Sequence, residues 1–425
     1  MSEVWDVIVS GAGLSGVLTA SRIHQAKPEW RILIVDKNPM PGGRIVTTEP
    51  HNNRWGYGMN NLGDNLYEFI GQAKKVDPEA SELTEHIKSI RGRGGILAAG
   101  KITPLNIEDS FKPTAGRAFA GAIGEKDWKH VEKVSTFLGD EKKGATAFGT
   151  VWPGTRKSPS AIVMEHIGRA AGIADIWAAS TNAVIERIGA FAKPAHHGQW
   201  EPILEELLEV SSEESTLHLN NSCRILGAKY ENETWQLDSE QGPLFAKKLV
   251  VAQDPWSAQD WLPKKLWPQK VLQVPSKTKP ISAVTISEKI KHCEGLPELL
   301  FIPAESVQVF SGEKEICYQV TLPFEFTLQA PAVVKAVKRL KRARRKVMSI
   351  FPDLSPSQDR LALLPVAWPQ PVTPSDRRIV EKLDNQQFQQ KHLAFCGDSY
   401  GGNFDGDQNI IDSVISASET FIQEK

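Results

Sequence analysis

Three glycines and one aspartate near the start of the chain have the spacing of a phosphate-binding site. Gly11, Gly13 and Gly16 follow one another as GxGxxG, and Asp36 comes 20 residues after the last of them. Glycines in this pattern permit a tight turn, the approach of a pyrophosphate to the backbone, and close packing of a helix on a strand. A carboxylate at the distance of Asp36 accepts hydrogen bonds from ribose hydroxyls. These four residues predict a dinucleotide site.

The neighbouring residues supply the elements that such a site requires. An apolar β-branched run at 7–9 is typical of a strand buried on both faces, and a second apolar run ends on Asp36. Between them, Leu14, Val17 and Leu18 recur at helical spacing. We therefore expect a strand, a turn, a helix and a second strand over residues 4–36. The helix start would direct its N–H groups and its dipole at the phosphates, whereas a tight turn without a ligand is the alternative.

A second glycine turn indicates which dinucleotide the site would bind. Gly42, Gly43 and Arg44 follow 6 to 8 residues after Asp36. With this turn the sequence resembles the flavin-containing amine oxidase superfamily, which includes amine oxidases, protoporphyrinogen oxidases and phytoene desaturase-like enzymes. The resemblance implies FAD, with the Arg44 guanidinium reaching its pyrophosphate. It assigns to cofactor binding Gly11, Ala12, Gly13, Leu14, Ser15, Gly16, Asp36, Lys37, Gly43 and Arg44.

A second signature of the same superfamily lies near the C-terminus. Gly397 and Asp398 follow an apolar strand, and a helix is predicted over 408–422. By resemblance, Asp398 accepts hydrogen bonds from the ribityl chain, and the helix start stabilises charge on the flavin ring. The residues implied at that helix start are Asn409 and Ile410. The resemblance also places Cys223 against the adenine, through backbone groups.

The fold class that follows is α/β. We expect a Rossmann-type FAD-binding domain, interleaved with an α+β substrate domain that contains a mixed sheet and a helical cap. Alternating stretches at 283–286 and 316–322 predict antiparallel strands in that mixed sheet, and residues 64–90 are predicted to be helical. The expected FAD-binding domain comprises 1–60, 196–255 and 371–425. The expected substrate domain comprises 61–195 and 256–370.

Composition excludes several classes of function. The 425 residues carry a net charge of −1, which gives no general attraction to nucleic acid. The four cysteines have no CxxC spacing, and His196-His197 has no further ligands nearby, so we expect neither a metal site nor a disulfide framework. No signal peptide and no apolar run long enough to span a membrane is apparent, which predicts a cytoplasmic protein.

One segment departs from this neutral balance. Residues 335–346 contain eight Lys or Arg. Val334, Val337, Leu340, Val347 and Ile350 predict an apolar stripe, interrupted by Arg344, so an amphipathic helix with a solvated cationic face is the simplest interpretation. The alternative is peripheral contact with lipid or with a partner.

The resemblance implies an oxidoreductase that transfers hydride from a small-molecule substrate to N5 of the flavin. Lys279 precedes a predicted strand in the region where amine oxidases place a lysine near N5, and Trp368 lies where relatives present an aromatic residue. No cysteine stands just before the final motif, so we expect FAD to be bound without a covalent link. A desaturase or protoporphyrinogen-oxidase-like enzyme for an apolar substrate is one alternative. A binding protein without FAD, like the Rab GDP-dissociation inhibitors, is another.

Overall fold

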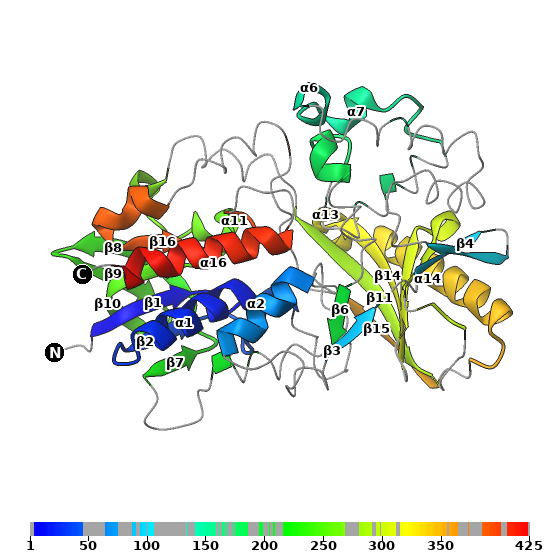
Figure 1. The fold of residues 1–425 in the computed structure, drawn as a ribbon. Helices are drawn as coiled ribbons and strands as arrows, with labels where there is room; N and C mark the ends of the chain where they lie inside the picture. Colours follow the sequence, from blue (N-terminus) through cyan, green and yellow to red (C-terminus); the bar gives the residue numbers. More distant parts are fainter. Residues whose placement is uncertain are drawn as a thin grey trace.

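The fold is seen in a computed structural model of the chain (Figure 1). It describes residues 4–45, 64–74, 87–90, 94–98, 100–105, 133, 141–158, 161, 164–165, 168, 173, 175–185, 195–198, 204, 207–208, 216–267, 280–290, 295–297, 299–311, 315–354, 357–363, 373, 385–400 and 406–423. Two seven-stranded sheets organise this part of the chain, and they lie next to each other along its long axis.

The first sheet is a parallel sheet extended by a hairpin. Its five parallel strands are, in spatial order, β7 (Leu217–Asn220), β2 (Ile32–Val35), β1 (Val4–Ser10), β10 (Gly242–Val251) and β16 (Leu393–Phe395). The first half of β10 instead pairs antiparallel with β9 (Thr234–Ser239), which pairs with β8 (Ile225–Glu231). This order and direction confirm the predicted Rossmann-type unit.

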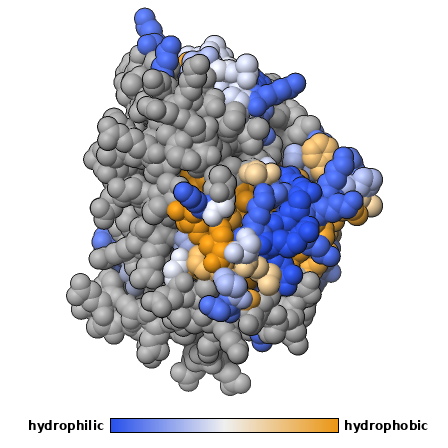
Figure 2. Space-filling view, turned by 90° about the vertical axis from the view of Figure 1, so that its right-hand side faces the viewer, coloured by the Kyte–Doolittle hydropathy of each residue, from blue (hydrophilic) through white to orange (hydrophobic). Residues whose placement is uncertain are grey.

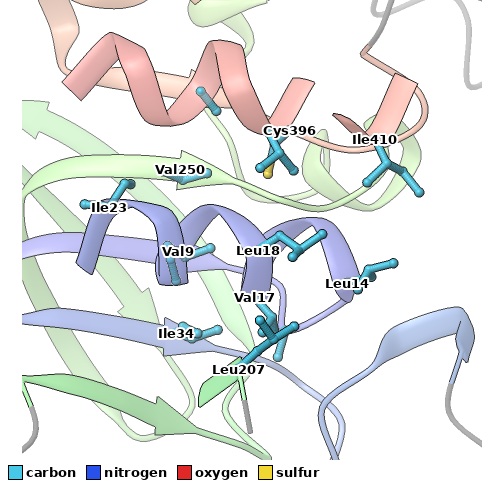
Figure 3. Packing of buried hydrophobic residues seen from close by; sticks show 14 of the residues in the cluster. Val9, Leu14, Val17, Leu18, Ile23, Ile34, Leu207, Val250, Cys396 and Ile410 are labelled. Carbon is cyan, nitrogen blue, oxygen red and sulfur yellow. The ribbon is translucent and has the colours of Figure 1, made fainter. Parts of the chain in front are cut away.

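Three helices cover one face of this sheet. They are α1 (Leu14–Ala26), α2 (Asp64–Lys74) and α16 (Gly406–Ile422), which lie side by side in Figure 1. Leu18 of α1, Ile70 of α2 and Val414 of α16 are buried in one cluster with side chains of β1 and β2. Figure 3 shows the part of this cluster between α1 and α16. Apolar side chains from both ends of the sequence therefore share one core.

The opposite face carries a second core. It contains Trp235 of β9, Phe395 of β16, and Trp261 and Trp267 from the segment after the short helix α11 (Pro255–Ala258). The 3-10 turns at Lys264–Leu266 and Asn385–Lys391 also contribute to this layer. The parallel strands are covered on both sides, which explains their continuous apolar runs.

The second sheet is mixed, as expected. Its spatial order is β15 (Ser357–Leu363), β11 (Ile281–Lys289), β14 (Glu315–Pro323), β13 (Val307–Ser311), β12 (Leu299–Ile302), β4 (Gly94–Ala98) and β5 (Lys101–Leu105). Only β12 and β4 are parallel neighbours; the other pairs are antiparallel. The antiparallel pairing of β11 with β14 confirms the strands predicted at 283–286 and 316–322.

The long helix α14 (Ala330–Ile350) covers one face of the second sheet. Its buried side chains are Ala336, Leu340, Ala343 and Val347. The predicted stripe was therefore wrong in part, since Val334 is 52% exposed. The helix turns its alanines to the sheet, because a small side chain lets the helix axis approach the strands closely.

Shorter elements complete the described structure. They are the strands β3 (Ile87–Ile90) and β6 (Ala195–Gly198), the helices α6 (Glu141–Gly144), α7 (Phe148–Val151) and α13 (Phe324–Thr327), and the 3-10 turns Gly43–Ile45 and Pro303–Glu305. β3 pairs antiparallel with β6, so the helix predicted to run to residue 90 was wrong at its end. No helix within the described ranges has the length and apolarity to cross a bilayer.

Candidate nucleotide-binding site

The turn between β1 and α1 needs two of its glycines for the protein's own packing. Gly11 has a φ of 113°, and a Cβ there would lie 2.8 Å from the carbonyl oxygen of Ala252. A Cβ on Gly16 would overlap the carbonyl oxygen of Gly11, which is backbone and has no room to move. α1 therefore packs on β1 at a distance that only glycine allows.

Gly13 differs from its two neighbours in the motif. Its φ of −70° and ψ of 170° suit any residue, and a Cβ there would meet no atom of the described residues within 4 Å. It is also the N-cap of α1, and no side chain accepts a hydrogen bond as a cap there. The fold thus places open space and a helix N-terminus at the same point, which is the arrangement that binds phosphate.

The second glycine turn forms one wall of this space. The N–H of Gly42 donates to the carbonyl oxygen of Ala12 at 2.7 Å. A Cβ on Gly43 would lie 3.4 Å from the Cα of Gly13. The two turns, which are about 30 residues apart in the sequence, are therefore in direct contact. Because their glycines have no side chains, a ligand has room to approach the backbone.

Asp36 is tied to the first turn. Its Oδ2 accepts the N–H of Ala12 at 2.7 Å, and its Oδ1 accepts the N–H of Asn38 at 2.8 Å. The residue is 8% exposed. Each carboxylate oxygen has a further lone pair, so the same group can orient the turn and accept a ribose hydroxyl. Lys37, next to it, is exposed.

The segment after β7 closes the site on the side of β2. The N–H of Cys223 donates to the carbonyl oxygen of Asp36 at 2.8 Å, and Cys223 is buried. Because that N–H is engaged, the carbonyl group is the better candidate for the predicted adenine contact. Asn221 lies two residues earlier, and its Oδ1 is buried without a hydrogen-bond partner in this part of the structure. The sequence did not indicate Asn221, since an Asn after a strand is typical of any turn.

The C-terminal motif reaches the same edge of the first sheet. Gly397 follows β16 with a φ of 139°, and its N–H donates to Ser413 Oγ of α16 at 2.9 Å. Asp398 is 8% exposed, Asn409 is fully buried, and Ile410 belongs to the core between α1 and α16. Parallel strands end at one edge, so Gly397 and Asp398 lie on the side where Gly11 and Asp36 lie.

One contact joins the two motifs directly. Cys396 Sγ lies 3.7 Å from the carbonyl oxygen of Ser15, although 381 residues separate them. Figure 3 shows the Cys396 side chain between α1 and α16, with Leu18 and Ile410 nearby. Complete burial raises the pKa of this thiol to about 12, so it stays protonated at neutral pH. Burial also raises the pKa of Tyr400, whose hydroxyl donates to the carbonyl oxygen of Gln253 at 2.7 Å.

The Cys396 thiol predicts a loss of stability in alkali. The folded state keeps the thiol neutral, whereas the unfolded chain ionises it above its ordinary pKa of 9.0. The free energy of unfolding should therefore fall by up to about 1.4 kcal/mol per pH unit between about 9 and about 12. Urea titrations of wild type and Cys396→Ala across this range measure it, and the alanine variant should show a shallower fall. Identical pH profiles would refute the assignment.

The second sheet also has a buried polar face. Thr285 of β11 and Gln308 of β13 are the register partners of Gln319 on the strand between them. All three side chains are at most 5% exposed, and they point away from the face that packs on α14. Gln319 Oε1 is buried without a hydrogen-bond partner in the described structure. A carbonyl oxygen in this state suits a ligand with an N–H or O–H group.

The structure does not describe the side chains of three predicted site residues. Lys279 and Trp368 lie outside the described residues. Only the backbone of Arg44 is described, within the 3-10 turn that starts at Gly43. Their roles remain predictions.

Comparison with known proteins supports this geometry. The profile of the NAD(P)-binding Rossmann-like domain matches residues 9–72, from β1 through α2. Among solved structures, a cyclohexylamine oxidase from Brevibacterium oxydans has a TM-score of 0.67 at 14% identity, covering 98% of this chain and 99% of that one. A putrescine oxidase bound to putrescine has a TM-score of 0.67 at 11% identity, covering 100% of both chains. The chain has the fold of these oxidases.

Two further similarities agree with this fold. A putative protoporphyrinogen oxidase from an Exiguobacterium species has a TM-score of 0.65 at 14% identity and covers 100% of both chains. The lycopene beta-cyclase of Pantoea ananas is 33% identical over 70 residues, which span 16% of this chain and 16% of that protein. These solved structures confirm the expected fold, a Rossmann-type unit combined with a mixed sheet.

Proposed function

We propose that this protein is an FAD-dependent oxidoreductase that holds FAD without a covalent bond. The observation that carries the proposal is the open space at Gly13. The polypeptide itself needs no glycine there, yet the position is bounded by Gly43 and lies at the N-terminus of α1. A pyrophosphate accounts for a glycine that neither backbone conformation nor packing requires.

Each remaining group has a role in the same proposal. The carboxylate of Asp36 would accept the ribose hydroxyls of the adenosine half, and Asp398 those of the ribityl chain. Arg44 would neutralise the pyrophosphate. Bound flavin would supply a two-electron acceptor, and the chain positions it by these contacts. Cys223 and Cys396 are buried and form no disulfide bond in the described structure, which supports the further proposal of a reducing, cytoplasmic location.

For the substrate we propose an amine of small size, with Lys279 and Trp368 beside the flavin. The oxidation of amines by relatives of this fold supports this choice, as their names state. Gln319 Oε1 would accept a hydrogen bond from the amine N–H, because this oxygen is buried without a partner in the structure described. The second candidate is an apolar substrate, which the similarity to a putative protoporphyrinogen oxidase favours.

Gly13→Ala tests the cofactor proposal. The added methyl group meets no atom in the part of the chain that the structure describes, so folding should be unchanged, but it occupies the space proposed for the pyrophosphate. Loss of charge-assisted hydrogen bonds to phosphate predicts a fall in FAD affinity of about tenfold to hundredfold. The measurements are the visible spectrum of the purified protein before and after denaturation, and FAD titration of the stripped protein.

Gly227→Ala is the matched control, because a Cβ on this β8 glycine makes only ordinary contacts, at 3.5 Å or more. It should leave both folding and FAD affinity unchanged. A wild-type protein that is colourless and does not take up added FAD would refute the proposal. If Gly13→Ala bound FAD with unaltered affinity, the pyrophosphate would not bind at this turn.

A further inference from the structure

The eight basic residues of α14 fall into two groups: in the described structure, four bond to residues outside the helix and four do not. Arg342 Nε and Lys346 Nζ each lie 2.7 Å from a carboxylate oxygen of Glu305, whose side chain is 7% exposed. Burial alone would raise the pKa of Glu305, but the hydrogen bonds and charges of Lys346 and Arg342 lower it overall. Arg344 Nε lies 2.7 Å from Oε1 of Glu288, which is buried in β11. Arg339 Nε donates to the Glu305 carbonyl oxygen at 2.6 Å. These four cations are used within the fold.

The other four point away from the sheet. Lys335, Lys338, Lys341 and Arg345 are all exposed, and their spacing of three or four residues places them along one side of the helix. No ion pair with an acid of the described structure involves them. Their positive charge is therefore presented to whatever lies outside the protein.

Exposed apolar side chains precede these cations in the sequence and occur at the start of the helix. Leu328, in the turn between α13 and α14, is 73% exposed, Val334 is 52% exposed, and Phe326 of α13 is 40% exposed. Glu325 is the one acidic residue between positions 324 and 346. Figure 2 shows a cluster of hydrophilic side chains beside hydrophobic ones on the face of the molecule that lies at the right in Figure 1, toward which α14 extends. We call Phe326, Leu328, Val334 and the four outward cations the α13–α14 surface.

The chemistry of this surface matches that of an anionic membrane. Lysines and arginines near a surface of anionic lipid gain attraction individually, and large apolar side chains beside them enter the boundary between headgroups and acyl chains. A nucleic acid would satisfy the cations but would leave Leu328 and Val334 in water. Single exposed apolar residues are common on protein surfaces, whereas three of them close to a row of cations in the sequence indicate an interaction surface.

We propose that the α13–α14 surface docks the protein on anionic lipid. Phe326 and Leu328 enter the bilayer interface, and Lys335, Lys338, Lys341 and Arg345 meet the headgroups. This docking is independent of the cofactor and leaves the nucleotide-binding sheet unaltered.

Co-sedimentation of the full chain with vesicles tests the proposal. Wild type should bind vesicles of phosphatidylcholine mixed with phosphatidylglycerol, bind vesicles of pure phosphatidylcholine weakly, and dissociate as salt is added. The variant K335Q/K338Q/K341Q/R345Q should lose about fivefold in affinity per charge, or several hundredfold in total. The variant F326S/L328S should also bind more weakly. All six positions are exposed, and thermal unfolding verifies that the variants fold.

The control K101Q/K264Q/K265Q/K391Q removes four exposed cations elsewhere and the same total charge. It should bind mixed vesicles almost as wild type does. Equal binding by the control and by K335Q/K338Q/K341Q/R345Q would overturn the proposal, because binding would then follow net charge alone. Absence of wild-type binding at low salt would overturn it too. A third result would also overturn the proposal: the protein binds a short RNA duplex more tightly than vesicles, and F326S/L328S binds that duplex as wild type does.

Discussion

Gly16→Ala should lower the free energy of unfolding by at least about 3 kcal/mol, because overpacking against backbone cannot be relieved by a side-chain rotation. The new Cβ would overlap the Gly11 carbonyl oxygen and would lie 3.0 Å from the Cβ of Ala252. Both neighbours belong to strand ends at the centre of the first sheet, so α1 would have to move off the sheet. Urea denaturation of the cofactor-free protein measures the effect, since bound ligand would itself add stability.

Gly13→Ala supplies the contrast for this prediction. It adds the same methyl group three residues earlier, where none of the residues described in the structure has an atom within 4 Å. Its urea midpoint without cofactor should match that of wild type, whereas Gly16→Ala should unfold at clearly lower urea. Equal midpoints for wild type and Gly16→Ala would mean that the close approach of α1 to β1 is not a source of stability.

Arg344→Leu should destabilise the second sheet by about 3–5 kcal/mol, the usual cost of leaving one partner of a buried ion pair alone. The Glu288 side chain is 2% exposed, and Arg344 Nε lies 2.7 Å from its Oε1. Tyr318 of the neighbouring strand β14 is 1% exposed and interacts electrostatically with both Glu288 and Arg344, so little water reaches the carboxylate. The change is measured as the shift in urea midpoint at constant slope.

Two comparisons separate the ion pair from the charge itself. Arg345→Leu removes an equal charge from the exposed side of the same helix and should change stability by less than about 0.5 kcal/mol. The double variant Glu288→Leu/Arg344→Leu should recover most of the loss, because no buried charge remains. If Arg344→Leu behaved as Arg345→Leu does, the pair would contribute nothing to folding.

Local patterns in the chain were enough to predict the Rossmann-type unit. Gly11, Gly13, Gly16 and Asp36 are close in sequence and belong to one strand–turn–helix–strand unit. The alternation of side chains along β11 and β14 predicted an antiparallel sheet for the same reason, since a period of two depends only on neighbours. Such features follow from covalent geometry and side-chain spacing, whatever the rest of the chain does.

Local patterns failed where distant neighbours determine the outcome. Residues 87–90 form a strand because 195–198 supply its hydrogen bonds, and no helical pattern reveals that partner. In α14, the buried side consists of Ala336, Leu340, Ala343 and Val347, and the ion pairs of Arg344 with Glu288 and of Arg342 and Lys346 with Glu305 accompany this packing, while Val334 is exposed. A run of basic residues in the sequence does not reveal which of them form ion pairs with a buried acidic side chain.

Tertiary structure also determined what each motif residue does. Asp36 accepts two backbone N–H groups of the protein besides any ribose, and Gly13 differs from Gly11 and Gly16 in needing no glycine for packing. Cys396 meets Ser15 across 381 residues because parallel strands bring the two chain ends to one edge of a sheet. Residue types and spacing therefore specified the strand–turn–helix–strand unit and its two glycine turns. Long-range packing, which depends on the simultaneous burial of segments far apart in the chain, specified which faces of the two sheets are covered and which side chains are left exposed.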